Sequence, residues 1–479
     1  MTTRPPGRRG LAGARLAVGV VVAAAAVAGA TALVILPVPT LARDGGVAVA
    51  AQPPASASVA ACAGPILSTG RDATRAGQLT DAAAVALTQA ATSAGQRAQA
   101  SSTTLTAPDV TGGAGPVALR AVPVGDQPAE IAAASSAQVS AEDLSGFVAS
   151  ACARPEMESW LVGGSAATGA SDLVVLANPG SVAARVSITV YGAAGAAVPA
   201  PGKAIVVPAG TQRVVPLASL AIGEENPVLR VTSAQAPVRA SLQASLTRVL
   251  VAGGVDQIGA TAVPGTDIVI PGVPVVTTQG GAGESNVPTS VRLLSPSADA
   301  QATVTVLQGG GAVGAPQTVP LTAGIPLKLD LGGLAPGTYA VRVSATAPVT
   351  GAVWSTSGFG AGSDFGWFAA ADQITAPALV AVAAASPLAA TPSLTLVSSS
   401  GEPQTVVVSA GAGTGATTDV TVPGAGTATI TVRPGEVYRI DPGAGSVRAA
   451  VTYAGAGAVA GYPVAPSASA AAAVTVYPR

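Results

Sequence analysis

Short runs of alternating apolar and polar residues dominate the chain after about residue 60. Side chains of a strand point alternately to the two faces of a sheet, so a period of two residues predicts half-buried strands. Strands spaced by about 8 to 12 residues and separated by Gly and Pro are typical of antiparallel sandwiches. The pattern therefore predicts a mainly β protein. The clearest runs are 173–176, 185–191, 302–307, 405–409 and 427–432.

The strand pattern also repeats at a longer period. A repeat of about 110 residues fits one small β-sandwich better than a solenoid coil. We therefore predict three tandem immunoglobulin-like β-sandwich units over 160–270, 285–375 and 390–479. The matching pairs, with their offsets, are Asn178 and Ser295 (117), Arg230 and Arg342 (112), Asp256 and Asp364 (108), and Arg342 and Arg448 (106).

The segment over 61–153 has two interpretations. GFVAS at Gly146–Ser150 resembles GAVWS at Gly351–Ser355, which indicates a fourth, poorly preserved β unit. Against this, Thr80–Gln99 is rich in alanine, the strongest helix former. We prefer the β interpretation.

The N-terminus carries a localisation signal. An uncharged run over 16–36 is long enough to span a membrane as a helix, and the arginine-rich segment 1–15 before it is expected to stay cytoplasmic. This predicts a single-pass cell-membrane protein with the bulk of the chain extracytoplasmic. The alternative is secretion after cleavage near Ala50, where the sequence AVA fits a signal-peptidase site. An Ala, Ser and Pro-rich stretch over 44–60 predicts a flexible stalk.

The chain has two cysteines, Cys62 and Cys152, and both follow the apolar run. In an oxidising compartment an even number of cysteines predicts a disulfide. Two buried free thiols are the alternative.

Composition excludes several function classes. The chain has no histidine, which removes Ser-His-Asp and Cys-His nucleophiles and His-based zinc sites. Without the four arginines before the apolar run, 19 basic residues face 24 acidic ones, a net charge of −5. Nucleic-acid binding needs a basic surface, so nucleic acid is not expected as a partner. We also expect no cofactor and no metal site.

Two groups of residues are candidates for a site. Pairs of carboxylates could hydrolyse glycosidic bonds. Aromatic rings on a glycine-rich loop could stack on sugars or anchor a partner, but the repeat favours packing between units, because the matching connector after Asp256 carries Ile258, a plain packing residue. The carboxylate pairs are Glu156 with Glu158, Glu224 with Glu225, and Asp364 with Asp372, and the aromatic residues are Trp354, Phe359, Phe365, Trp367 and Phe368.

Three stretches resemble a known family. ACAGP at Ala61–Pro65, CARPEMESWLVGG at Cys152–Gly164 and LVVLANPG at Leu173–Gly180 are similar to landmarks of an actinobacterial family of membrane-anchored or secreted envelope proteins of unknown function. Some members are labelled large extracellular protein. The resemblance implies an envelope location and supplies no catalytic residues.

These observations together predict a non-catalytic cell-envelope protein that presents tandem β-sandwiches for binding or structural bracing. The expected partner is an unknown envelope protein or a cell-wall glycan. Two alternatives remain, a cell-wall polysaccharide-binding module and a carboxylate-based glycan hydrolase.

Overall fold

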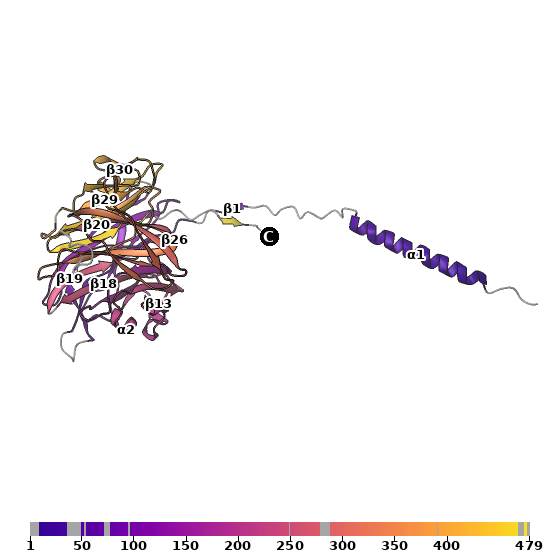
Figure 1. The fold of residues 1–479 in the computed structure, drawn as a ribbon, viewed down its shortest axis with the longest axis horizontal. Helices are drawn as coiled ribbons and strands as arrows, with labels where there is room; N and C mark the ends of the chain where they lie inside the picture. The colour runs from indigo at the N-terminus through magenta and orange to yellow at the C-terminus, as the bar shows by residue number, and fades with distance from the viewer. Residues whose placement is uncertain are drawn as a thin grey trace, which may run out of the picture. The chain divides into compact units, whose positions relative to one another are not determined.

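Strands build most of the protein, as the alternation predicts (Figure 1). The computed structural model describes residues 9–35, 49–51, 54–70, 77–93, 96–248, 250–277, 288–389, 391–467 and 474–476. The chain divides into two units, 55–470 and a smaller one formed by 1–54 and 471–479. The smaller unit contains helix α1 (Arg9–Ile35) and a sheet of β1 (Val49–Ala51) and β36 (Val474–Val476).

The N-terminal apolar run is helical in α1. Among the described residues, however, no helix combines the length and apolarity needed to cross a membrane. The predicted anchor over 16–36 is therefore not confirmed. Of the predicted basic segment and stalk, residues 1–8, 44–48, 52 and 53 lie outside the described residues, and the stalk range includes β1 and the start of β2 (Ser58–Ala61).

Three stretches of the larger unit supply two sheets each. Their strands are β11 (Glu158–Val162), β12 (Leu173–Asn178), β13 (Ala184–Gly192), β14 (Gly195–Ala197), β15 (Ile205–Val207), β16 (Thr211–Pro216), β17 (Val228–Ala234), β18 (Arg239–Arg248) and β19 (Val251–Ile258); then β20 (Gly265–Val275), β21 (Thr289–Leu294), β22 (Ala300–Gln308), β23 (Gly311–Ala312), β24 (Gln317–Leu321), β25 (Leu327–Asp330), β26 (Gly337–Thr356) and β27 (Phe365–Ala369); and β28 (Ala378–Ala381), β29 (Ser393–Val397), β30 (Gln404–Ser409), β31 (Thr417–Val422), β32 (Thr427–Thr431), β33 (Val437–Asp441), β34 (Arg448–Gly455) and β35 (Ala458–Pro463). Short helices are η1 (Ala200–Gly202), α2 (Leu217–Leu220) and η2 (Gly411–Gly413).

The three stretches share one strand order. The sheets are β11-β17-β13 with β16-β12-β18-β19, β20-β26-β22 with β25-β21-β26-β27, and β28-β33-β30 with β32-β29-β34-β35. We call these stretches the first, second and third sandwich, because the two sheets of each contribute to a common apolar core. In the second sandwich, β26 serves both sheets: residues up to Val349 pair with β20 and β22, and residues from Thr350 pair with β21 and β27.

Residues before Glu158 form a related unit, here called the N-terminal sandwich. Its sheets are β2-β8-β7 and β10-β9-β5-β6, and a hairpin of β3 and β4 lies beside them. The helical alternative for Thr80–Gln99 is wrong, because pairing with β9 overrides the local preference of alanine. The remaining strands are β3 (Ile66–Thr69), β4 (Leu79–Ala83), β5 (Ala86–Ser93), β6 (Gln96–Ala98), β7 (Ala100–Thr104), β8 (Val117–Ala121), β9 (Ala129–Ser140) and β10 (Ser145–Ala151).

The disulfide between Cys62 and Cys152 is present, which confirms its prediction. Cys62 directly follows β2 and Cys152 directly follows β10, so the bond ties the two sheets of the N-terminal sandwich together. Beside it, the Ala61 N–H donates to the Ala153 carbonyl at 2.8 Å, and the Ala153 N–H donates back at 3.0 Å.

The last strands of the four sandwiches pack against one another. Strand β10 contacts β19 and β35, and β27 contacts the same two strands, so the four form a closed ring. Phe147 on β10 also packs edge-on against Tyr453 on β34, with ring centroids 5.3 Å apart. Through this ring of strands, each of the four sandwiches contacts two of the others.

One buried carboxylate joins this ring. Asp364, directly before β27, is 0% exposed, and its Oδ2 accepts the Phe147 N–H at 2.8 Å and the Val459 N–H at 3.0 Å. Its Oδ1 lies 3.4 Å from the Val255 nitrogen. The side chain therefore holds β10, β35 and β19 to the second sandwich. On the neighbouring strand, Asp256 accepts the Trp367 N–H at 2.7 Å.

Two glycines allow strands to approach Asp364. Gly146 and Gly254 have φ of +148° and +124°, which residues with a Cβ rarely adopt. A Cβ on Gly146 would overlap the Asp364 carboxylate, and one on Gly254 would lie 2.5 Å from the Phe365 ring. Asp256 and Asp364, which the sequence comparison matched, thus both lie buried at the ring.

Two sequence matches align different strands. Arg230 and Arg342 lie on the equivalent strands β17 and β26, but Arg448 opens β34, where its counterpart is Arg239 on β18. Similarly, GFVAS forms β10, whose equivalents are β19, β27 and β35, whereas GAVWS lies in β26. Short alternating strands resemble one another, so similarity of pattern alone shifted both matches by one strand.

Replacing Asp364 by alanine should lower the free energy of unfolding by about 3 kcal/mol or more, because two buried N–H groups lose their acceptor at about 1–3 kcal/mol each. Denaturant unfolding of the full chain measures this. Asp330→Ala is the matched control, since Asp330 is half exposed in a surface ion pair and its loss should cost under about 1 kcal/mol. Equal effects of the two substitutions would contradict the role of Asp364.

Stability should fall as the pH rises from about 4 to 7. Burial raises the pKa of Asp256 to about 7 and that of Asp364 well above its usual value. The folded state therefore holds protons that the unfolded state has released, which costs up to about 1.4 kcal/mol per pH unit for each group. Denaturant unfolding at pH 5 and pH 8 tests this. Asp256→Asn should reduce the change in the free energy of unfolding between the two pH values, and the control Asp330→Asn should leave that change unaltered. A stability that increases over this range would refute the expectation.

Reducing the disulfide should destabilise the protein by about 4–5 kcal/mol, because the bond joins positions 90 residues apart and restricts the unfolded chain. Unfolding with and without reductant measures the difference. The variant Cys62→Ser/Cys152→Ser should match the reduced protein and respond no further to reductant.

Candidate functional site

The structure separates the predicted aromatic residues into two groups. Phe365, Trp367 and Phe368 are 3%, 8% and 2% exposed. Phe365 and Trp367 pack into the core of the first sandwich, and Phe368, on the opposite face of β27, packs into that of the second. Trp354 is half-buried, whereas Phe359, in the turn between β26 and β27, is 36% exposed. Trp354 lies between the rings of Phe359 and Phe365, with centroids 6.3 Å from each.

Trp354 lines a cavity between the first and second sandwiches. The cavity has a volume of about 440 Å³, within the range of small-molecule sites. One wall is the sheet β25-β21-β26-β27, and the other comes from β18 and from loops of the first sandwich. The side chains that matter to its chemistry are Asp172, Arg248, Arg292, Lys328, Trp354 and Trp367.

Strand register builds the wall from the second sandwich. Lys328 on β25 is directly opposite Arg292 on β21. Ser290, two residues before Arg292, is opposite Trp354, which is in turn opposite Trp367. Residues opposite each other in register, and residues two apart on one strand, share a face of the sheet. The alternation therefore places two cations and two indole rings on the face toward the cavity.

Arg292 lines the cavity and is 4% exposed. Its Nη1 donates to the carbonyls of Gly164 and Pro227, each at 2.9 Å, and its Nη2 donates to Asn226 Oδ1 at 3.2 Å. The guanidinium carbon lies 4.5 Å from the Trp367 ring centroid. Burial lowers the pKa of Arg292 to about 9, against the opposing effect of Asp172. The side chain is thus a positive charge held by neutral oxygens.

Asp172 is the buried acidic group of the cavity. Its Oδ2 accepts the Ser165 N–H at 2.6 Å, and its Oδ1 accepts the Ser245 N–H at 2.8 Å. Burial raises its pKa to about 7, although these bonds and Arg292 oppose the shift. Near neutral pH it therefore offsets only part of the positive charge.

Arg248 and Lys328 are the more accessible cations. The Arg248 guanidinium lies 4.5 Å from the centroid of Phe359, and no described residue forms an ion pair or hydrogen bond with it. Lys328 forms a 3.5 Å ion pair with Asp330, and both side chains are about half exposed. Both cations remain available to a ligand.

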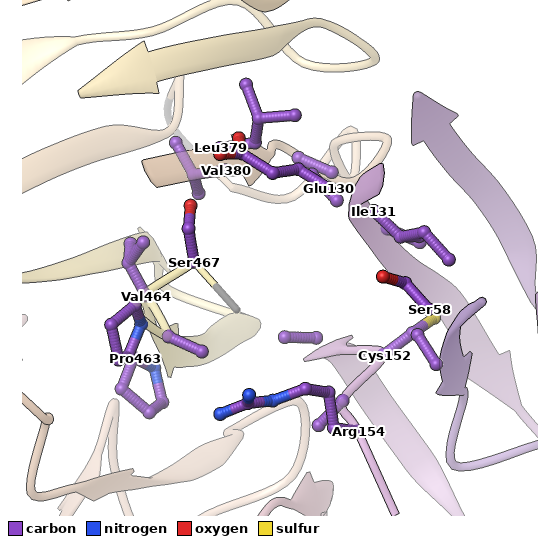
Figure 2. Close-up of a pocket in the computed structure, with 18 of the residues that line it drawn as sticks. Ser58, Glu130, Ile131, Cys152, Arg154, Leu379, Val380, Pro463, Val464 and Ser467 are labelled. Atoms are coloured by element: carbon purple, nitrogen blue, oxygen red, sulfur yellow. The ribbon is translucent and has the colours of Figure 1, made fainter. Parts of the chain in front are cut away.

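A smaller cavity of about 130 Å³ lies between the N-terminal and third sandwiches (Figure 2). Figure 2 shows Glu130 and Arg154 on its walls, near Cys152 of the disulfide. Glu156 and Asp372 also line it, and they line an adjoining cavity of about 110 Å³ as well. Burial raises the pKa of both carboxyls, and each is partly offset by Arg154. The structure thus brings together two carboxylates from different predicted pairs.

The other candidate carboxylates have structural partners. Asp364 is enclosed in the strand ring. Glu158 pairs with Arg230 at 2.5 Å and accepts from Trp160 Nε1, and Glu224 accepts the Ala193 N–H at 2.8 Å. Glu225, in contrast, lines the cavity between the first and second sandwiches. No cluster of three or more potential metal ligands occurs among the described residues.

Sequence reasoning missed Arg248, Arg292 and Lys328. Arg292 carries a usable signal, because it is a charged residue in the strand TSVRLL, whose six residues are all buried. Such a residue needs polar partners or a functional reason. For Arg248 and Lys328 the sequence carries no comparable signal, since both occupy ordinary strand positions near turns.

Comparison with known proteins identifies a family that the chain matches. The model of a family of unknown function, DUF5719, matches residues 109–433. Among curated proteins, none matches the chain. This result agrees with the resemblance to an uncharacterised family, while the actinobacterial origin and envelope location stay predictions. Because the match covers more than half of the 479 residues, the chain belongs to the DUF5719 family of unknown function.

Proposed function

We propose that the protein is a non-catalytic binding protein of the cell envelope, and that it takes a cell-wall saccharide in the cavity between the first and second sandwiches. The observation that carries this proposal is the pairing of a half-buried Trp354 with polar and charged side chains around a volume of about 440 Å³. An indole face offers a flat apolar surface for a sugar ring, and nearby polar groups can orient its hydroxyls.

Several features support an envelope location. The disulfide is a feature of proteins that fold outside the cytoplasm. An arginine-rich segment followed by the apolar run over 16–36 is what an anchor or an export signal requires. We propose that this segment anchors the chain, with residues after about 40 extracytoplasmic, and that secretion after cleavage near Ala50 is the alternative.

The repeated strand order favours a structural contribution as well. We propose that the three sandwiches are diverged immunoglobulin-like units. Their closed ring is suited to bracing, because each unit contacts two others and Asp364 accepts N–H groups from the N-terminal and third sandwiches. A rigid body would hold the cavity walls at a constant separation.

The carboxylates do not favour hydrolysis. Glu156 and Asp372 line cavities of only about 130 and 110 Å³, below the size of typical ligand sites. A glycan chain would have to open the interface between sandwiches to reach them. We therefore propose binding without cleavage.

Replacing Trp354 by alanine should weaken binding to purified cell-wall polysaccharide at least tenfold, about 1.4 kcal/mol, because the stacking surface is lost. Co-sedimentation and calorimetry with the full chain measure this. Tyr438→Ala is the control, since Tyr438 is a similarly half-buried aromatic residue in the third sandwich. Unchanged binding by the Trp354 variant would reject this cavity as the saccharide site.

A further inference from the structure

We propose that the cavity between the first and second sandwiches selects an acidic saccharide, whose carboxylate or phosphate group contacts Arg248 and Lys328 while a sugar face packs on Trp354. This inference rests on the proposed function and specifies the ligand class of the same site. It follows from charge, register and hydrogen bonding around the cavity.

The first argument is an unfavourable pair of charges. Arg292 and Lys328 are directly opposite each other in the β21-β25 register and share the face toward the cavity. Side chains at such positions have Cβ atoms about 5 Å apart, and like charges there repel each other. Asp330 reaches Lys328 at 3.5 Å, but it is half exposed and therefore weakly effective. An anion within the cavity would relieve this repulsion.

The second argument is that no carboxylate of the described residues forms an ion pair with Arg292. Its Nη atoms are used by carbonyl and amide oxygens, and no carboxylate of the described residues is close enough for an ion pair. Three acidic residues lie near Arg292. Asp172 already accepts two backbone N–H groups, Glu224 accepts the Ala193 N–H, and Glu225 lines the cavity without forming an ion pair with Arg292. A buried charge without a counter-ion acts strongly on its surroundings because solvent screens it poorly. Arg292 thus adds positive charge to a cavity lined by the cations Arg248, Arg292 and Lys328 and the carboxylates Asp172 and Glu225, without contacting the ligand directly.

The third argument is that Arg248 is oriented but unpaired. Its guanidinium lies on the Phe359 ring at 4.5 Å, and the side chain is partly shielded from water. A guanidinium held in this way presents its remaining donors with little loss of entropy, and these donors match the two oxygens of a carboxylate or phosphate. Phe359 itself turns toward Trp354, so the charged and stacking surfaces are adjacent.

The direct test compares matched ligands on the full-length protein. The probes are trigalacturonate, its fully methyl-esterified form and glucose 1-phosphate, with binding followed by tryptophan fluorescence and calorimetry. We expect trigalacturonate to bind at least tenfold more tightly than its neutral ester, with an affinity that falls as salt is raised. Binding of the sugar phosphate but not the uronate would identify phosphate as the group recognised.

Variants that remove positive charge measure how much Arg248 and Lys328 contribute to binding of the acidic probe. Arg248→Gln/Lys328→Gln should lower the affinity for the acidic probe at least tenfold and leave that for the ester unchanged. The matched control is Arg97→Gln/Lys203→Gln, which removes two exposed cations outside the cavity, Lys203 being the other lysine of the chain. Thermal unfolding confirms that each variant is folded.

The outcomes distinguish the two proposals. Equal binding of the acidic probe and its ester, or an acidic affinity unaffected by the double variant, would overturn the selection of an acidic ligand. If the ester still binds in a Trp354-dependent manner, saccharide binding survives that result. Failure of all probes to bind, together with no loss of cell-wall binding in Trp354→Ala, would overturn both.

Discussion

The Asp364 carboxylate is the interaction on which the arrangement of the larger unit depends. It is buried, it precedes the last strand of the second sandwich, and it accepts N–H groups from the last strands of two others. A buried carboxylate is costly unless such donors surround it. The hydrogen bonds that satisfy the Asp364 carboxylate therefore also fix the positions of β10 and β35 relative to the second sandwich.

The amino-acid composition makes this arrangement feasible. A chain with 58 glycines and few aromatic residues can bring strands of separate units close together, as Gly146 and Gly254 show beside Asp364. The cores then extend across unit boundaries: Phe365 and Trp367 of the second sandwich join the core of the first, and Val459 of the third joins that of the second. Because many side chains are small, neighbouring sandwiches pack directly against one another and share core residues.

The large cavity is a consequence of the same packing. Phe365 and Trp367 bring the sheet β25-β21-β26-β27 against the first sandwich, and the space left beyond them is lined by Arg248, Arg292 and Trp354. Arg292 spans the junction, because its strand belongs to the second sandwich and its hydrogen bonds are to Gly164, Asn226 and Pro227 of the first. The candidate site therefore exists only while the two sandwiches are joined.

The β class, the strand positions and the disulfide could be predicted from the sequence alone, because they depend on alternation between near neighbours and on a choice among only two cysteines. The sequence also marked Asp256 and Asp364 as a repeated pair. The contacts that these residues form became apparent only in the tertiary structure. Asp256 and Asp364 became ring contacts, and Arg448 proved equivalent to Arg239, because register and packing between distant strands are set by many weak contacts. Lys328 and Arg292 are 36 residues apart in the sequence, and they line one cavity together with Arg248 only because of that packing.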